Sequence, residues 1–351
     1  MYRFSLLASK TEIEALASEW RELHRRCGAA PFTDYDWIMV WWRHIGSKMG
    51  ASLLVCVCRD EDRLVGVIPL CLVRKGGGRI LKLAGHEVYY YRTFLAENPE
   101  LAAEMWRYIL ACPCYDLAEV KNIHAGTAED AFFQRCGTRI EESIVYHVEH
   151  IGLSRDELLS IHSGNTQRRI RKARKEILAQ PTMSVEHTCE YPAPEPVIQF
   201  LLEQKMKWVE ARGKRGVFRQ KGVFDFYREI IKLAAESGKM LMYWMERDGK
   251  ILGASLNFIE GKVVYGHTLA IDRSASRYRP GFYLSWEAII WAAEHGYEES
   301  NFSEGAEEYK TRFTKKGRIT HVYLYPRTLH GQILSFLYRL VLRYRRSHER
   351  G

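Results

Sequence analysis

A turn rich in arginine connects a strand-like segment to a helix-like segment late in the chain. Arg273, Arg277 and Arg279 lie in this turn, and Pro280-Gly281 follows directly. The first N–H groups of a helix have no intrahelical acceptor, and the N-terminal end of the helix dipole is positive. With guanidinium groups beside it, such an end is suited to bind a phosphate or diphosphate. Many α/β crossover connections contain a similar turn, so an ordinary connection is the alternative interpretation.

The segments around this turn predict a strand, a helix, a second strand and a second helix between Lys262 and Phe313. The side chains that would share one face of the first strand are Val263, Tyr265, His267, Leu269 and Ile271. The helix after Pro280 is apolar on opposite sides, which predicts that it is largely buried. Gly296 is a natural C-terminal stop for it.

The composition predicts a protein of two ordinary domains, because the chain has 351 residues and 46% of them are hydrophobic. Its formal net charge of +9 favours anionic partners such as phosphorylated cofactors, nucleic acid or an acidic lipid surface. Neither a secretory signal nor a membrane-spanning apolar run is apparent, which predicts a cytoplasmic protein. The 8 cysteines form no C-x-x-C pair, so reduced core thiols are favoured over a zinc site or a disulfide framework.

The order of the expected elements recurs in the two halves of the chain. The hairpin turns Arg59–Gly66 and Arg247–Gly253 read alike, so we infer two copies of one α/β unit. Only the second copy has an arginine-rich Pro-Gly turn before its crossover helix, so we expect a phosphorylated donor there. The expected parts are a first domain (1–150), a basic linker helix with a Pro-rich linker (151–196), a second domain (197–328) and a basic amphipathic helix (329–351).

Two further helices carry clustered basic residues. Six of the eight residues from Arg168 to Lys175 are arginine or lysine. They form either a solvated face or an electrostatic guide for the phosphates of a cofactor, a carrier protein or RNA. From Ile333 to Tyr344 the tail is amphipathic, with arginines toward its end. This tail either docks onto the protein or makes peripheral contact with anionic lipid.

Several short motifs, taken in their order and spacing, resemble the CelD-type acetyltransferase family over nearly the whole chain. They are Pro31-Phe32 with Trp37 and Trp41; Arg168–Lys175; Lys207-Trp208 with Gly213; Asp272 with Tyr278, Pro280-Gly281 and Leu284; and Gly305 with Tyr309-Lys310 and Arg312-Phe313. That family has a tandem GNAT (N-acetyltransferase) fold related to the Fem aminoacyltransferases of cell-wall bridge synthesis. The resemblance implies an α/β (α+β) fold of two GNAT-like domains, each a mixed, mostly antiparallel sheet flanked by helices. The first domain would be degenerate and serve the acceptor or the structure.

The resemblance also implies an activity: transfer of an acetyl or longer acyl group from acyl-CoA, without a metal. The acceptor would be an amine or hydroxyl of a small molecule, a sugar or a cell-envelope precursor, since the family is often linked to exopolysaccharide chemistry. The enzyme would be cytoplasmic or peripheral at the inner face of the membrane. In the GNAT arrangement, the strand after the phosphate-turn helix splays from its neighbour and admits the pantetheine arm. Residues expected to bind the donor are Leu269, Ala270, Ile271, Arg277, Arg279, Pro280, Gly281 and Phe282.

Acyl transfer to an amine needs one group that accepts the amine proton and another that donates a proton to the leaving thiolate. Tyr309 stands where the GNAT helix carries a tyrosine toward the sulfur, so we predict it as the acid, with packing as the alternative. Glu304 and His267 are the candidate bases, against a surface ion pair and a hydrogen-bonded core histidine. The residues expected to line the acceptor pocket are Trp37, Trp208 and Tyr265.

Two other functions stay open from the sequence. A Fem-like aminoacyltransferase would draw its donor from charged tRNA and use the basic helix as an RNA guide. A non-catalytic basic binding protein on a decayed transferase fold would explain two departures from the family. Arg279 stands where a small residue is usual before Pro-Gly, and Asn301 stands where an aspartate is usual on the strand before Gly305. An acyl-carrier protein could replace CoA as donor, and DNA is not an expected partner.

Overall fold

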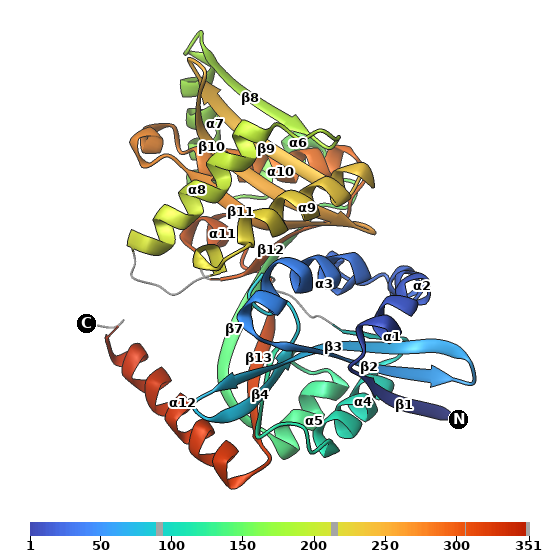
Figure 1. Ribbon diagram of the computed structural model, residues 1–351. Helices are drawn as coiled ribbons and strands as arrows, with labels where there is room; N and C mark the ends of the chain where they lie inside the picture. Colours follow the sequence, from blue (N-terminus) through green and yellow to red (C-terminus); the bar gives the residue numbers. More distant parts are fainter. Residues whose placement is uncertain (89–93, 212–216, 306, 349–351) are drawn as a thin grey trace. The chain divides into compact units, whose positions relative to one another are not determined.

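The structure, a computed structural model, describes residues 1–88, 94–211, 217–305 and 307–348, the last four without their side chains. Gly213, one of the motif residues, lies outside these ranges. The chain divides into two compact units (Figure 1). Unit 1 comprises Met1–Ser143 and Ile319–Gly351, and unit 2 comprises Ile144–Arg318.

Unit 1 contains a mixed sheet with the strand order β1-β2-β3-β4-β6-β13, in which β5 also pairs with β3. Its strands are β1 (Tyr2–Leu7), β2 (Ser52–Asp60), β3 (Arg63–Lys75), β4 (Gly78–Leu83), β5 (Leu95–Ala96), β6 (Leu117–His124) and β13 (Gly317–Pro326). Its helices are α1 (Lys10–Ala15), α2 (Ala17–Cys27), α3 (Tyr35–Trp41), α4 (Pro99–Ala111), α5 (Ala128–Cys136) and α12 (Leu329–His348). Strands β4 and β6 are parallel, whereas the other pairs are antiparallel.

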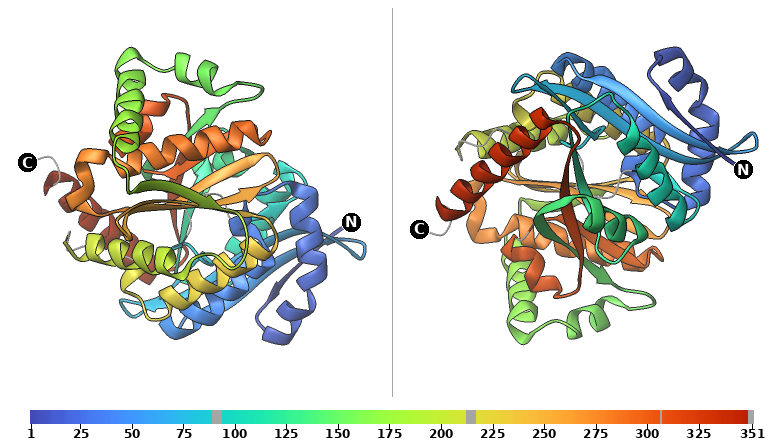
Figure 2. Two further views of the ribbon diagram at one scale, coloured as in Figure 1. Left: turned by 90° about the horizontal axis from the view of Figure 1, so that it is seen from above. Right: turned by 90° about the horizontal axis from the view of Figure 1, so that it is seen from below.

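The strands of unit 2 are hydrogen-bonded in the order β7-β12-β11-β10-β9-β8, with both parallel and antiparallel pairs. Its strands are β7 (Thr138–Glu149), β8 (Met183–Thr188), β9 (Met240–Arg247), β10 (Lys250–Glu260), β11 (Val263–Ile271) and β12 (Glu299–Glu304). Its helices are α6 (Arg155–Ser160), α7 (Gly164–Leu178), α8 (Glu195–Ala211), α9 (Val223–Glu236), α10 (Pro280–Glu294) and α11 (Glu308–Phe313), with a 3-10 helix η5 (Arg273–Tyr278). Helix α10 lies on one face of the sheet, and α8 and α9 cover the other (Figure 2).

The two units repeat one topology, as the recurring element order predicted. A hairpin (β2-β3 or β9-β10) is followed by a third strand (β4 or β11), a crossover helix and a parallel neighbour (β6 or β12). The parallel neighbour carries a bulge opposite its antiparallel partner in both units. The bulges hold Asn122 at φ 59° and Ser303 at φ 57°, a left-handed backbone that is uncommon outside glycine.

Two strands carry the chain from one unit to the other. The boundary after Ser143 falls within β7, whose later residues pair with β12, and the boundary after Arg318 falls within β13, which pairs with β6. These boundaries differ from the expected ones. The expected linker, 151–196, is part of unit 2, because α7 packs into its core and β8 pairs with β9. Local sequence patterns predict a strand but not its pairing partner. The sequence therefore did not show that β7 pairs with β12 and β13 with β6.

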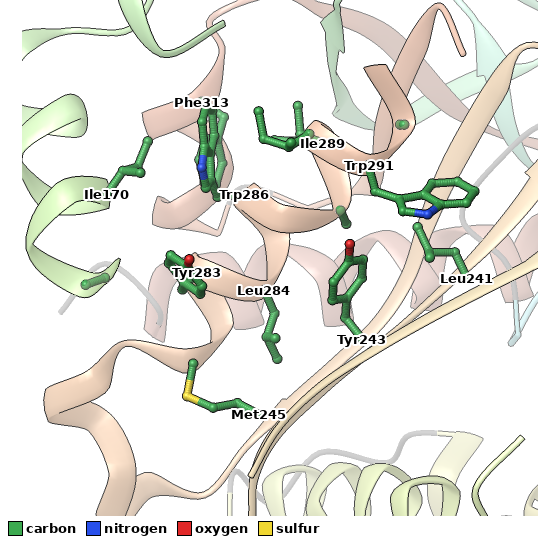
Figure 3. Close-up of a cluster of buried hydrophobic side chains, with 14 of the residues drawn as sticks. Ile170, Leu241, Tyr243, Met245, Tyr283, Leu284, Trp286, Ile289, Trp291 and Phe313 are labelled. Carbon is green, nitrogen blue, oxygen red and sulfur yellow. The ribbon is translucent and has the colours of Figure 1, made fainter. Parts of the chain in front are cut away.

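Helix α10 lies at the centre of the apolar core of unit 2 (Figure 3). Leu284, Trp286 and Ile289 are all buried, which confirms the prediction from its apolar pattern. Gly296, at φ 77°, follows the end of the helix as expected for a C-terminal stop. The apolar side of α7, including Ile170, packs against this core and leaves its basic side toward solvent. The core therefore fixes the starting point of α10 relative to β11 and α7.

Candidate functional site

Strands β11 and β12 form a fork. They pair in parallel over three positions, from Val263 with Glu299 to Tyr265 with Asn301. Beyond this point β11 continues to Ile271 and β12 to Glu304, and no described strand pairs with β11 on the β12 side. The Ser303 hydroxyl donates to the Gly266 carbonyl at 2.7 Å and so closes the base of the fork. The backbone N–H and C=O groups along the free edge of β11 could form hydrogen bonds with an extended amide chain.

The N-terminus of α10 opens beside the end of this free edge. Pro280 occupies the first turn, which contains no acidic residue, and no side chain caps the helix. The N–H groups of Gly281 and Phe282 consequently have no intrahelical acceptor. A Cβ atom added at Gly281 would lie 3.2 Å from Leu269 Cδ2 and 3.3 Å from Ile271 Cγ2. Glycine therefore lets the start of the helix approach the end of β11 closely.

The arginines of the turn differ in how they are held. Arg277 lies over the Tyr278 ring, 4.4 Å from its centroid, and donates to the Tyr278 hydroxyl. Arg247 Nη1 donates to the same hydroxyl at 2.7 Å. Within the described residues, Arg279 Nη1 is buried and has no hydrogen-bond partner. Arg279 also precedes the helix at φ 51°, in the left-handed region. A buried guanidinium nitrogen without an acceptor is costly unless a ligand supplies one.

The basic side of α7 borders the same turn, since α7 contacts both η5 and α10. Arg168 and Arg174 are exposed there, and neither has an ion-pair partner within the described chain. Burial raises the pKa of the Tyr283 hydroxyl on α10, and the positive charge of Arg174 opposes that shift. This side of α7 therefore adds positive potential near the start of α10.

Helix α11 packs against the start of α10 and against β12. Phe313 stacks on Phe282 with ring centroids 4.8 Å apart, and Tyr309 meets Phe302 edge-on at 6.3 Å. Burial, with a further contribution from the charge of Glu307, raises the pKa of Tyr309. The Tyr309 hydroxyl stays protonated at neutral pH and has no hydrogen-bond partner among the described residues. It can therefore donate a hydrogen bond to a ligand.

A buried lysine, Lys310, joins α11 to the end of β12. Its Nζ donates to the Glu304 carbonyl oxygen at 2.8 Å and pairs with Glu307 Oε2 at 2.8 Å, while the side chain is 4% exposed. Burial lowers the pKa of Lys310, and Glu307 opposes this shift. Lys310 thus holds the backbone that carries Tyr309. Sequence reasoning included Lys310 only as a motif residue; its i,i+3 spacing from Glu307 was the available signal.

The two predicted bases lie in different surroundings. Burial, together with the charge of Lys205, lowers the pKa of His267 to about 3. Because its pKa is this low, the imidazole is a weak proton acceptor at neutral pH. Its Nε2 atom lies 3.1 Å from the Tyr227 hydroxyl. Glu304 is half-buried at the open end of β12, and its carbonyl is bound by Lys310. The catalytic roles of both residues stay predictions.

The predicted acceptor residues are not gathered within one unit. Trp208 is half-buried on α8, with Lys205 Nζ 5.4 Å from its ring centroid, and Tyr265 is buried on β11. Trp37 belongs to unit 1, where it is 2% exposed and meets Phe32 edge-on at 4.9 Å. The three roles stay predictions.

The described part of the chain shows neither a metal-binding group nor a membrane-spanning helix. There, no group of three or more His, Cys, Asp and Glu side chains is arranged to hold a metal ion. None of the described helices combines the length and apolar character needed to cross a bilayer.

Comparisons with known proteins relate part of the sequence and the overall fold to GNAT proteins. Residues 164–311 match the family model of the acetyltransferase (GNAT) domain. Among solved structures, FemX aligns over 95% of this chain and 100% of its own, with a TM-score of 0.62 and 11% identity. A tandem GNAT protein from the clavulanic acid biosynthesis pathway aligns over 92% of this chain and 98% of its own, with a TM-score of 0.53 and 12% identity. No protein with a curated description matches the sequence.

At these identities the structural neighbours establish the fold alone. The matched segment contains the fork, the arginine turn, α10 and most of the Tyr309 region. Residues 164–311 therefore resemble a GNAT acetyltransferase domain, in a chain with the fold of FemX and of tandem GNAT proteins.

Proposed function

We propose that the chain is an acyl-CoA-dependent N-acyltransferase whose donor site lies in unit 2. The observation that carries the proposal is the uncapped N-terminus of α10, with the unpartnered Arg279 Nη1 beside it, at the mouth of the β11–β12 fork. The N–H groups of Gly281 and Phe282 and the Arg279 guanidinium bind the diphosphate. The amides of the pantetheine arm pair with the backbone of Leu269, Ala270 and Ile271.

The transfer needs two proton movements. The acceptor amine nitrogen bonds to the thioester carbonyl carbon and loses a proton, which Glu304 takes directly or through water. The carbon–sulfur bond then breaks, and the Tyr309 hydroxyl protonates the leaving thiolate. We assign Glu304 rather than His267 as the base because the pKa of His267, lowered to about 3, makes it too weak an acceptor. Lys310 positions Tyr309 by holding α11 to the end of β12.

The CelD-type resemblance supports a narrower form of this proposal. In that form the acceptor is an amine or hydroxyl of a small molecule, a sugar or a cell-envelope precursor. Trp208, with its ring half-buried on the sheet face that α8 covers, contacts the acceptor. A panel of amino sugars, polyamines and sugar alcohols, assayed with acetyl-CoA and longer acyl-CoAs, identifies the acceptor class and the acyl length.

Calorimetric titration of acyl-CoA and thiol-release assays test the proposal together. Wild type should bind acyl-CoA and release CoA thiol with at least one acceptor. Tyr309→Phe should bind the donor normally and turn over slowly. Tyr297→Phe is the matched control, because Tyr297 is another half-buried tyrosine of unit 2 whose pKa is raised by burial. Failure of wild type to bind any acyl-CoA would contradict the proposal.

A second function is supported by a separate observation, the exposed basic side of α7 together with the FemX-like fold. On this alternative, the donor is an aminoacyl-tRNA, and α7 contacts its backbone phosphates. Binding of charged tRNA at physiological salt, without binding of CoA, would favour it. Binding of CoA without thiol release for any acceptor would instead favour a non-catalytic binding protein.

A further inference from the structure

Helix α12 has apolar side chains on two opposite sides, and only one of them packs against unit 1. The packed side includes Leu334, Tyr338 and Leu342, which lie against Leu117, Val322 and their neighbours. Helix α12, drawn in red in Figure 1, contacts β4 and β6. One apolar side is sufficient to dock a helix on a sheet, so the other side needs a separate explanation.

The rotation of α12 about its axis is fixed by close contacts on the packed side. A Cβ atom added at Gly331 would lie 1.9 Å from the Asp116 carbonyl oxygen, so only glycine fits there. The Tyr338 hydroxyl donates to Glu119 Oε1 at 3.2 Å. The helix therefore cannot turn its second apolar side inward without losing these contacts.

The second side is a continuous exposed stripe. Its members follow helical spacing and are exposed as follows: Leu329 78%, Ile333 57%, Phe336 54%, Leu337 50%, Leu340 44%, Val341 50% and Tyr344 65%. Exposed apolar residues are common singly, but a row of this length along one helix indicates an interaction surface. We call these seven residues the α12 stripe.

The charge of α12 indicates the kind of surface it meets. The helix contains no aspartate or glutamate over Leu329–His348, and Arg339 and Arg343 are exposed beside the stripe. The sequence continues with Arg345 and Arg346. Two copies of such a helix packed together would bring their arginines close without any acidic partner from α12. An anionic lipid surface complements both the apolar stripe and the arginines.

We propose that the α12 stripe lies in the interface of an anionic membrane and holds the protein there peripherally. The apolar side chains enter the boundary between headgroups and acyl chains, and Arg339 and Arg343 contact lipid phosphates. This inference is independent of the proposed acyl transfer, since α12 belongs to unit 1 and contributes no residue to the donor site.

Flotation of the full chain with vesicles tests the proposal. Wild type should float with vesicles of equal parts phosphatidylcholine and phosphatidylglycerol, and much less with phosphatidylcholine alone. The double variant Phe336→Ser/Leu340→Ser should lower binding by about tenfold or more, because buried apolar area drives insertion. Arg339→Gln/Arg343→Gln should lower binding to the anionic vesicles by roughly tenfold or more and reduce its salt dependence.

Matched controls distinguish vesicle binding by the α12 stripe from non-specific binding by other exposed side chains. Ile161→Ser/Leu178→Ser removes two other exposed apolar side chains, 58% and 74% exposed, and should leave flotation unchanged. Lys48→Gln/Arg135→Gln removes two exposed charges elsewhere in unit 1 and should also have little effect. Thermal unfolding checks that each variant is folded.

Two results would overturn the proposal. One is wild type that does not float with anionic vesicles at low salt. The other is a stable dimer in sedimentation that Phe336→Ser/Leu340→Ser converts to monomer while vesicle binding is unchanged, because the stripe would then be an interface between copies of this chain.

Discussion

The forks of the two units share one strand arrangement and differ in what fills them. In unit 1, β4 pairs with β6 from Ile80 with Leu117 to Lys82 with Glu119, and β4 ends one residue later. In unit 2, both β11 and β12 continue past their last pair. Within the described residues, the third strand therefore extends past the parallel pair in unit 2, as β11, but ends almost at once in unit 1, as β4.

Charged side chains occupy the fork of unit 1. Lys82 Nζ lies 2.8 Å from Glu119 Oε2, and Lys121 Nζ lies 3.3 Å from Glu119 Oε1. The nearby His86 Nε2 lies 3.2 Å from Glu87 Oε1. In unit 2 a serine hydroxyl closes the base of the fork instead. Paired charged side chains thus fill the fork of unit 1, whereas the fork of unit 2 leaves the backbone polar groups of β11 for a ligand.

The crossover helices show the same contrast. In unit 1, Asn98 caps α4 by accepting from the Leu101 N–H at 2.8 Å, and Glu100 follows in the first turn. The cap and the carboxylate satisfy and neutralise that helix end. Helix α10 has neither at its start, and Arg277 and Arg279 lie in the turn that precedes it. On the proposed function, the start of α10 therefore stays open to an anion, whereas the start of α4 is satisfied within the protein.

The largest expected effect comes from removing the proposed acid. Tyr309→Phe should lower the turnover number by about 10²–10⁴-fold, as is typical for loss of a general acid. The dissociation constant of acyl-CoA should change little, because the hydroxyl is assigned no contact with the diphosphate. Steady-state thiol release and calorimetry measure the two quantities. Equal turnover in Tyr309→Phe and wild type would remove Tyr309 from the chemistry.

Breaking the charged fork of unit 1 should affect stability instead of donor binding. Lys82→Met removes one of the two lysine charges that pair with the buried Glu119 carboxylate. This change should lower the unfolding free energy by about 3 kcal/mol at neutral pH. Denaturant unfolding measures the loss, with Lys48→Met, an exposed lysine of the same unit, as control. If the variant lost acyl-CoA affinity while remaining folded, the contrast between the two forks would fail.

The same fork predicts an acid-sensitive stability. Burial raises the pKa of Glu119, but Lys82 and Lys121 outweigh burial and hold it at about 2, below an ordinary value of about 4.3. Because the pKa of Glu119 is lower in the folded protein than in the unfolded chain, its ionised carboxylate stabilises the fold at pH values above the ordinary pKa. About 3 kcal/mol of stability should therefore disappear as the pH falls from about 4.3 toward 2. Unfolding curves across this range should show a smaller change in Lys82→Met, and an unaltered pH dependence in that variant would exclude Glu119 as the source.

Arg279→Gly should change affinity and stability in opposite directions. Loss of the guanidinium should weaken acyl-CoA binding by about tenfold, the value of one charge-assisted hydrogen bond. Glycine adopts the left-handed conformation at φ 51° without the strain of a side chain, so stability should rise by up to about 1 kcal/mol. Calorimetry and thermal unfolding of the variant, with Arg135→Gln as a charge control, measure both. A loss of affinity accompanied by loss of stability would indicate a structural role for Arg279.

The smallest expected effect concerns α7. Arg168→Gln/Arg174→Gln should weaken acyl-CoA binding by roughly two- to threefold at low salt and by less at high salt, because exposed charges act through a screened field. Titrations at two ionic strengths measure the difference. A far larger loss of tRNA binding than of CoA binding would instead support the aminoacyl-tRNA alternative.

The sequence predicted the parts whose signal is local. The arginine turn, the buried pattern of α10 and the recurring hairpins all depend on residues close together in the chain, and the structure confirms these elements. The exchange of β7 and β13 was not predictable, because strand patterns do not name their partners. The pairing of Lys82 with Glu119 and the burial of His267 arise from contacts distant in sequence. The role of Lys310 in joining α11 to β12 was missed although its partners are close in the chain, because the spacing from Glu307 does not show that Lys310 Nζ also binds the Glu304 carbonyl.

A crystal structure of the chain with CoA tests the central claim most directly. We predict diphosphate oxygens within hydrogen-bond distance of the Gly281 and Phe282 N–H groups and of the Arg279 guanidinium, with the pantetheine arm along β11. CoA bound at the α4 end of unit 1, or held away from α10, would contradict the assignment of the donor site to unit 2.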